Sequence, residues 1–193
     1  SVAYDEPLAL NEIDDLMREM HRGGRGEPGL LNRFAAMQSQ LRLGREMDDI
    51  GTNACGEIVL RGSATADDGR PVPGGQFCNL TSVTARPNDT YYTLLEKVRV
   101  ATIIGTIQSM ADDFKLLRKG WRLNAEKDRL LGVDLNGIFD CPALLNASSN
   151  ELESLRDYTH EINTIYAAAL GINKSPAITC VKPSGNTSTL LDK

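Results

Sequence analysis

The chain has 193 residues, of which 41% are hydrophobic and 24% charged, so collagen-like, mucin-like and wholly disordered classes are excluded. A formal net charge of −5 and an aromatic content of 5% argue against a nucleic-acid-binding protein. No apolar run is long enough to cross a membrane, and the first residues lack a signal-peptide pattern, which predicts a cytoplasmic protein. Four cysteines without a CxxC pair and only two histidines predict no metal site.

The predicted secondary structure alternates between helices and strands within one domain over 1–193. An amphipathic helix is expected over 8–22, and Asn32 is expected to cap a second helix that ends at Gly44. The remaining predicted elements, in chain order, are a strand at 58–60, an exposed insertion loop at 62–76, a strand at 79–83, a buried helix at 90–114, a strand at 130–139, a helix from a cap at Asn150 to Gly171, and a strand at 177–181. This alternation predicts parallel βα units.

The stretch Asn53 to Glu57 (Asn-Ala-Cys-Gly-Glu) carries the most informative residue pattern. In extended backbone, Asn53, Cys55 and Glu57 would point to one side and offer an amide, a redox-active sulfur and a general base to one cavity. The alternative is an ordinary loop in which the Asn caps, the Cys is buried and the Glu is solvated. Spacing by itself leaves both readings open.

A second pattern follows the predicted strand at 177–181. Its residues, Pro-Ser-Gly-Asn-Thr-Ser over 183–188, combine free backbone N–H groups, a glycine and hydroxyls before an expected helix. Such a turn suits a phosphate group. An ordinary strand-to-helix turn with a Ser or Thr cap fits the same residues.

Five segments, taken together, resemble the large subunit of ribonucleotide reductases. The Asn53–Glu57 stretch is similar to the family's Asn-x-Cys-x-Glu finger loop, and Gln76-Phe77-Cys78-Asn79-Leu80 is similar to the second active-site cysteine segment of adenosylcobalamin-dependent, class II members. The segments at 26–33 (Gly-Glu-Pro-Gly-Leu-Leu-Asn-Arg), 131–138 and 177–185 resemble further parts of the same family in the same order. The likeness covers most of the chain.

The resemblance implies thiyl-radical chemistry that reduces ribonucleotides to deoxyribonucleotides. Cys55 would be the radical site that takes the 3′ hydrogen, Glu57 the general base, Asn53 a hydrogen-bonding group for the substrate hydroxyls, and Cys78 one of two reducing thiols. The implied residues of the substrate phosphate-binding loop are Ser184, Gly185, Asn186, Thr187 and Ser188.

The implied fold is part of a ten-stranded α/β barrel, from the finger loop to the phosphate-binding loop. The implied cofactor is adenosylcobalamin. The implied partners are a ribonucleoside di- or triphosphate, an external dithiol reductant such as thioredoxin, and complementary reductase segments or chains. Ala54 stands where the family often has Pro, the 62–76 loop is longer than usual, and no strand with a partner for Cys78 is found.

Two alternatives remain open. The chain is an assembly module, inactive by itself, that acts with complementary chains, or it is a related glycyl-radical barrel enzyme. The other prominent residues have plainer expectations: Cys141 and Cys180 are expected to be structural, and Trp121 is expected to be a local packing anchor.

Overall fold

The computed structural model describes residues 2–6, 8–24, 26 and 29–192, and the chain divides into two compact units, 1–50 and 51–193. The first unit contains β1 (Val2–Tyr4), α1 (Leu10–Gly23), β2 (Leu30–Asn32) and α2 (Arg33–Leu41), and β1 pairs with β2 in parallel. Two residues of the segment at 26–33, Glu27 and Pro28, lie outside the described residues.

Both helices predicted for the first unit are present, but α2 ends at Leu41 and not at Gly44. Helix α1 is followed by Gly24, whose φ of +61° suits a glycine, and none of the described residues of α1 is buried. Asn32 caps α2 as predicted, because its Oδ1 accepts a hydrogen bond of 2.8 Å from the Ala35 N–H.

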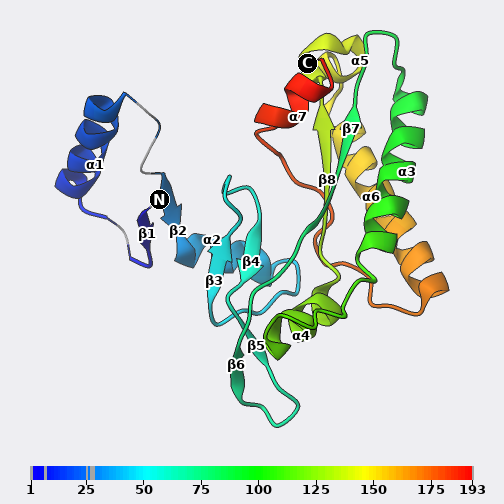
Figure 1. The fold of residues 1–193 in the computed structure, drawn as a ribbon. Helices are drawn as coiled ribbons and strands as arrows, with labels where there is room; N and C mark the ends of the chain where they lie inside the picture. Colours follow the sequence, from blue (N-terminus) through cyan, green and yellow to red (C-terminus); the bar gives the residue numbers. More distant parts are fainter. Residues whose placement is uncertain (1, 7, 25, 27–28, 193) are drawn as a thin grey trace. The chain divides into compact units, whose positions relative to one another are not determined.

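The second unit is built around two parallel strands. Its elements are β3 (Ile50–Thr52, at the boundary of the units), β4 (Val59–Arg61), β5 (Ser63–Thr65), β6 (Pro71–Pro73), β7 (Asn79–Thr84), α3 (Tyr91–Gln108), α4 (Lys119–Asp128), β8 (Leu131–Asn136), a 3₁₀ turn at Ile138–Asp140, α5 (Pro142–Leu145), α6 (Ser149–Leu170) and α7 (Gly185–Leu190). Strands β7 and β8 pair in parallel register from Asn79↔Leu131 to Thr84↔Asn136 (Figure 1). The predicted parallel βα unit is confirmed.

A third extended segment lies on the other side of β8. Val133 bridges to Thr179 in parallel, and the Cys180 N–H donates to the Val133 carbonyl at 3.1 Å. The predicted strand at 177–181 is therefore present as a short run of pairing, so the order across the sheet is β7, β8, 177–180.

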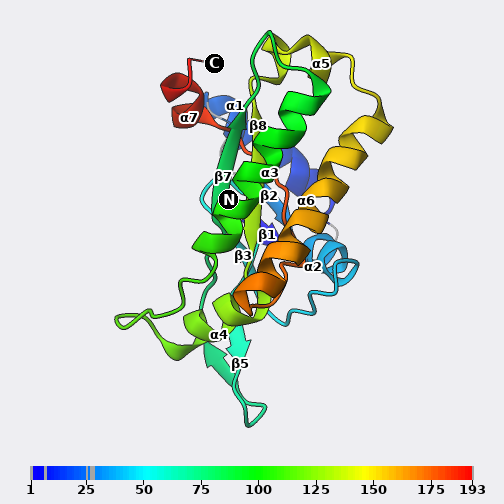
Figure 2. The ribbon, with the colours of Figure 1, turned by 90° about the vertical axis from the view of Figure 1, so that its right-hand side faces the viewer.

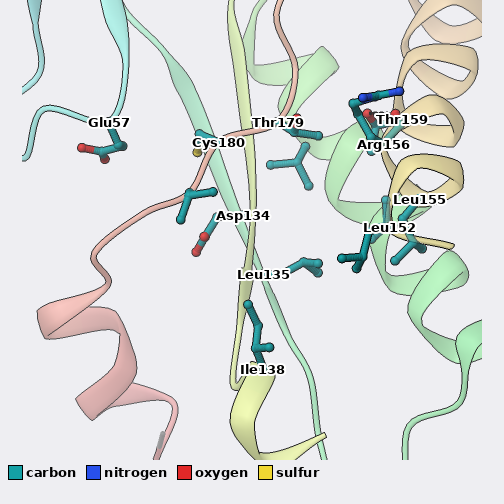
Figure 3. A pocket seen from close by; sticks show the side chains of 13 residues that line it. Glu57, Asp134, Leu135, Ile138, Leu152, Leu155, Arg156, Thr159, Thr179 and Cys180 are labelled. Atoms are coloured by element: carbon teal, nitrogen blue, oxygen red, sulfur yellow. Dashed lines mark hydrogen bonds between the residues drawn. The ribbon is translucent and has the colours of Figure 1, made fainter. Parts of the chain in front are cut away.

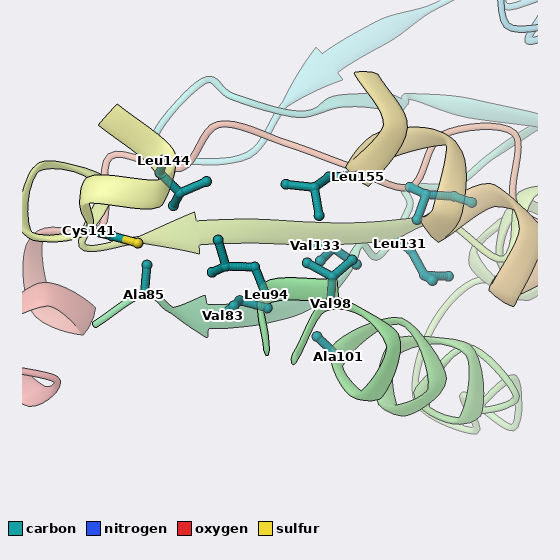
Figure 4. Close-up of a cluster of buried hydrophobic side chains, with 11 residues drawn as sticks. Val83, Ala85, Leu94, Val98, Ala101, Leu131, Val133, Cys141, Leu144 and Leu155 are labelled. Atoms are coloured by element: carbon teal, nitrogen blue, oxygen red, sulfur yellow. The ribbon is translucent and has the colours of Figure 1, made fainter. Parts of the chain in front are cut away.

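Helices α3 and α6 pack against one face of this sheet, where the core lies (Figures 2 and 4). Leu131 and Val133 alternate along β8 toward the helices, so Gly132, Asp134 and Asn136 face the other way. The core cluster consists of Val83, Ala85, Leu94, Val98, Ala101, Leu131, Val133, Cys141, Leu144, Leu155 and Ile178. Each fully buried Leu or Val contributes roughly 1.5–3 kcal/mol of transfer free energy. The two faces of β8 thus separate packing from polar chemistry.

Three predicted boundaries in the second unit are also wrong. Helix α3 ends at Gln108, and β8 ends at Asn136 because Gly137 adopts a φ of +74°. Ser148, not Asn150, caps α6, because the Ser148 hydroxyl accepts from the Glu151 N–H while the Glu151 carboxylate accepts from Ser148.

The insertion at 62–76 is an antiparallel hairpin rather than a loop. Strand β5 pairs with β6 from Ser63↔Pro73 to Thr65↔Pro71, and Gly69 turns the chain with a φ of +81°. Helix α4, which the sequence analysis did not predict, holds this hairpin: the Asn124 side chain donates to the carbonyls of Ser63 and Gly75, both at 3.0 Å. Trp121 of α4 packs against Phe77, with ring centroids 4.8 Å apart, as expected of a packing anchor.

The middle of α3 is buried on one side only, although the sequence predicted burial nearly all round. Val98 and Thr102 are buried, whereas Val100, Ile104 and Ile107 each keep about half of their surface exposed. Among the described residues the strands form pairs and no closed barrel, so a partial barrel stays a prediction. None of the described helices combines the length and apolar character that a membrane crossing requires.

Candidate functional site

The segment 53–58 is a closed turn, and not the extended stretch that the spacing argument assumed. The Asn53 side-chain oxygen accepts from the Ile58 N–H at 3.1 Å, and the Gly56 N–H donates to the Asn53 carbonyl at 3.0 Å. Gly56 has a φ of +81°, a conformation that favours glycine. Extended geometry therefore gives no reason for Asn53, Cys55 and Glu57 to share one side.

The two reactive side chains of the turn differ in their exposure to solvent. Cys55 is exposed, whereas the Glu57 side chain keeps only 5% of its surface. The structure thus contradicts both expectations of the ordinary-loop reading for these residues, a buried Cys and a solvated Glu. Asn53 does cap the turn, as that reading expected.

Glu57 is a buried carboxylate with unmet hydrogen-bonding capacity. Both of its oxygens are inaccessible and accept no hydrogen bond, and the Lys182 Nζ lies 3.5 Å from Oε1. Burial raises the pKa of Glu57, but its own backbone N–H, the Asn53 side chain and the Lys182 ammonium outweigh that effect. The pKa is held below its usual range, so Glu57 is ionised at neutral pH.

Two thiols converge on the polar face of the sheet, over Gly132 of β8. A Cβ on Gly132 would lie 2.9 Å from the Cys78 Sγ, 3.2 Å from the Cys180 Sγ and 2.5 Å from the Leu80 Cδ2. The missing side chain at this position therefore creates the space that both sulfurs use. The sulfurs nearest to this point belong to Cys78 and Cys180, not to Cys55.

Cys180 is a half-buried thiol outside the core cluster, which the sequence analysis had expected to be a plain core residue. Burial, then the negative charges of Asp134 and Glu57, raise the pKa of Cys180 to about 11, against a smaller opposing effect of Lys182. Cys141, by contrast, is fully buried in the core, as predicted.

We expect Cys180 to react slowly with iodoacetamide at pH 8. Because only the thiolate is nucleophilic, a pKa of about 11 slows alkylation on the order of 10²-fold relative to an unperturbed thiol. Peptide mass spectrometry over a time course at pH 8 and pH 10 measures the rates. Asp134→Asn removes one of the raising charges and should accelerate labelling of Cys180, and equal rates for Cys180 and the exposed Cys55 would contradict the prediction.

A buried polar network continues the same face toward the end of β8. The Asp134 carboxylate accepts from Ser82 Oγ at 2.8 Å, from the Lys182 backbone N–H at 3.2 Å and from Ser184 Oγ at 3.3 Å. Asn136 Nδ2 donates to Ser184 Oγ at 2.9 Å. These bonds tie the segment after the third strand to β8.

Within the predicted phosphate-binding residues, Ser184 is placed differently from the others. It is buried, with a φ of +54°, and its hydroxyl points into the network beside the Asp134 carboxylate, which opposes an anion there. Gly185 and Asn186 are exposed, and the Ser188 hydroxyl donates to the Gly185 carbonyl at 2.9 Å. The candidate phosphate-binding residues are therefore Gly185, Asn186, Thr187 and Ser188.

A pocket of about 650 Å³ lies where the third strand meets α6 (Figure 3). Glu57, Asp134 and Cys180 line one side of it, while Leu152, Leu155 and Arg156 of α6 line the other. One pocket therefore brings together an ionised carboxylate, a protonated thiol and an apolar wall, a combination suited to a small organic ligand.

The comparisons with known proteins add no relative. No family model, curated protein or solved structure matches this chain. The site therefore rests on the residues themselves.

Sequence reasoning missed four contributors: Gly132, Asp134, Cys180 and Lys182. The alternation Leu-Gly-Val-Asp-Leu-Asn over 131–136 already carried a signal, because it places Gly132, Asp134 and Asn136 on one face of a strand. For Lys182, nothing in the sequence indicated a partner 125 positions away.

Proposed function

We propose that this chain is the segment of a class II-type ribonucleotide reductase that carries the radical cysteine and the general base. The observation that supports this most concerns Glu57. This buried, ionised carboxylate accepts no hydrogen bond and lines the same pocket as the Cys180 thiol. Such a group is poised to accept a proton from a substrate hydroxyl. The resemblance over five segments supplies the reaction class.

In the proposed reaction, the Cys55 thiyl radical takes the 3′ hydrogen of the ribose, so that a C–H bond breaks and an S–H bond forms. Glu57 accepts the proton of the 3′ hydroxyl, while one thiol of the reducing pair gives a proton to the 2′ hydroxyl, which leaves as water. Cys78 and a second thiol then supply a hydrogen atom to C2′ and one electron to the 3′ ketone, and become a disulfide. Glu57 returns its proton to the 3′ oxygen. The hydrogen then returns from Cys55 to C3′, which regenerates the thiyl radical.

The cofactor and the partners belong to the proposal as well. Adenosylcobalamin enters through the resemblance alone, since no contact among the described residues selects a corrin ring, and no step above runs through it. A ribonucleoside di- or triphosphate would be held near 185–188. An external dithiol such as thioredoxin would reduce the disulfide, and the reaction would take place in the cytoplasm.

One observation favours the alternative of an assembly module. Over the described residues the third strand pairs with β8 on one side, and Val181 remains 88% exposed. An unpaired strand edge of this kind accepts another strand. Complementary reductase segments or chains would satisfy it, and this role is compatible with catalysis in the complete assembly.

The test is deoxynucleotide formation by the complete assembly that contains this chain, supplied with adenosylcobalamin, ribonucleotide and a dithiol. We expect Cys55→Ser to abolish product formation, because a serine O–H bond is too strong to be converted to the radical, and to leave substrate binding unchanged. Full activity in Cys55→Ser would contradict the proposal. Size-exclusion chromatography and circular dichroism on the chain alone test the assembly role, which a stable folded monomer would argue against.

A further inference from the structure

The ion pair between Lys182 and Glu57 joins two segments that are far apart in the sequence. The Lys182 Nζ and the Glu57 Oε1 are 3.5 Å apart, and the side chains keep 23% and 5% of their surface. Because both Glu57 oxygens lack hydrogen bonds, the ammonium group compensates this buried charge together with the Glu57 backbone N–H and the Asn53 side chain. A buried charge that loses its partner becomes neutral instead of staying ionised.

The backbone of Lys182 is held in place independently of its side chain. Its N–H donates to the Asp134 Oδ1 at 3.2 Å, and two residues later the Ser184 hydroxyl enters the same network. Pro183 between them restricts the backbone further. The base of the Lys182 side chain is thus anchored to β8, and this anchor fixes the direction from which its charge reaches Glu57.

We propose that Lys182 is a positioning residue that keeps the Glu57 carboxylate ionised and oriented toward the pocket. The catalytic meaning of this role rests on the proposed function, whereas the coupling of the two side chains does not. Lys182 acts through Glu57 and is not assigned a contact with substrate.

The other charged and titratable groups around the pocket do not replace this role. Asp134 lines the pocket as a carboxyl group and offers no cation to Glu57, and Cys180 is a protonated thiol at neutral pH. Arg156 of α6 lines the opposite side and pairs with Asp157 at 2.8 Å. Without Lys182, burial still favours the protonated form of Glu57, and the Glu57 backbone N–H and the Asn53 side chain oppose it.

The lowered pKa of Glu57 determines how the stability of the fold depends on pH. A carboxyl whose folded-state pKa lies below its unfolded value stabilises the fold above the unfolded pKa, and this stability is lost as the pH falls through the folded-state pKa. In Lys182→Met the folded-state pKa of Glu57 should rise toward its unfolded value. The stability that Glu57 contributes at neutral pH should shrink accordingly.

The experiment is a ¹³C NMR titration of the Glu57 carboxyl, assigned with Glu57→Gln, in the wild-type chain and in three variants. Lys182→Met should raise the proton affinity of Glu57 about tenfold or more, and Lys182→Arg should restore it. Lys115→Met is the matched control, since the Lys115 side chain is 80% exposed and pairs with Asp113. An unchanged midpoint in Lys182→Met would overturn the inference. If that variant does not fold, Lys182→Gln decides by the same criterion.

Activity of the complete assembly separates this inference from the proposed function. We expect Lys182→Met to move the acidic limb of the pH–rate profile to higher pH and to lower kcat with little change in KM. A shifted titration without deoxynucleotide formation by the wild-type assembly would refute the proposed function and leave the coupling intact. An active wild type with an unshifted titration would refute the role of Lys182 alone.

Discussion

Replacing Arg61 with methionine is expected to lower the free energy of unfolding by about 3–5 kcal/mol, because it removes one partner of a buried ion pair. Arg61 donates two hydrogen bonds to Asp128, from Nε to Oδ2 at 2.8 Å and from Nη2 to Oδ1 at 3.2 Å. The two side chains keep only 7% and 4% of their surface. Gln76 completes the cluster, as its Nε2 donates to Asp128 at 2.7 Å while its Oε1 accepts from the Arg61 N–H at 3.0 Å.

Urea unfolding followed by circular dichroism measures this loss of stability. The matched control is Arg70→Met, since Arg70 pairs with Asp68 in the exposed turn between β5 and β6. Their side chains keep 81% and 50% of their surface. That change should have a much smaller effect on the free energy of unfolding, because solvent screens an exposed ion pair. The double variant Arg61→Met/Asp128→Leu should recover part of the loss, because it replaces both members of the buried ion pair by apolar side chains. Equal effects of Arg61→Met and Arg70→Met would contradict the prediction.

Replacing Glu57 with glutamine is expected to reduce deoxynucleotide formation by about 10²–10⁴-fold, the usual contribution of a general base. Glutamine keeps the shape of the side chain but cannot accept a proton at neutral pH. Since Glu57 is 5% exposed and pairs with Lys182, the substitution also leaves that ammonium without its carboxylate. Because a general base acts on the chemical step, kcat should fall more than the substrate affinity.

The assay compares kcat and KM of the complete assembly across variants. Glu153→Gln on the exposed surface of α6 is the matched control and should leave both constants unchanged. Circular dichroism verifies that the Glu57→Gln chain is folded. A folded Glu57→Gln variant with wild-type kcat would remove Glu57 from the proposed chemistry.

Periodicity and capping residues in the sequence were sufficient for the main helices and strands. Asn32 and Thr90 cap α2 and α3 through side-chain oxygens, and both caps were readable because their bonds span only three residues. The hairpin at 62–76 was not readable, because what turns this Gly- and Pro-rich stretch into two strands is Asn124 of α4, bonded across more than forty positions.

The candidate site, too, could be predicted from the sequence only in part. The Asn-x-Cys-x-Glu spacing singled out Cys55 and Glu57, but the extended backbone on which their common direction was argued is absent, because the Asn53 side chain closes a turn. Burial of Glu57 depends on the surrounding packing, which one local stretch of sequence does not contain. The same holds for the convergence of Cys78, which directly precedes β7, and Cys180, which lies in the segment on the other side of β8.

The sequence by itself determined the composition class, the order of the main elements and the residues with chemical potential, since these depend on residue type and local spacing. Only the tertiary structure decided that Glu57 is buried beside Lys182, that the empty position at Gly132 holds two sulfurs, and that Ser184 turns inward toward Asp134. The physical reason is common to all three. Burial, electrostatic pairing and the room available to a side chain are properties of the neighbours that folding brings together, and these neighbours lie about fifty or more positions apart in the chain.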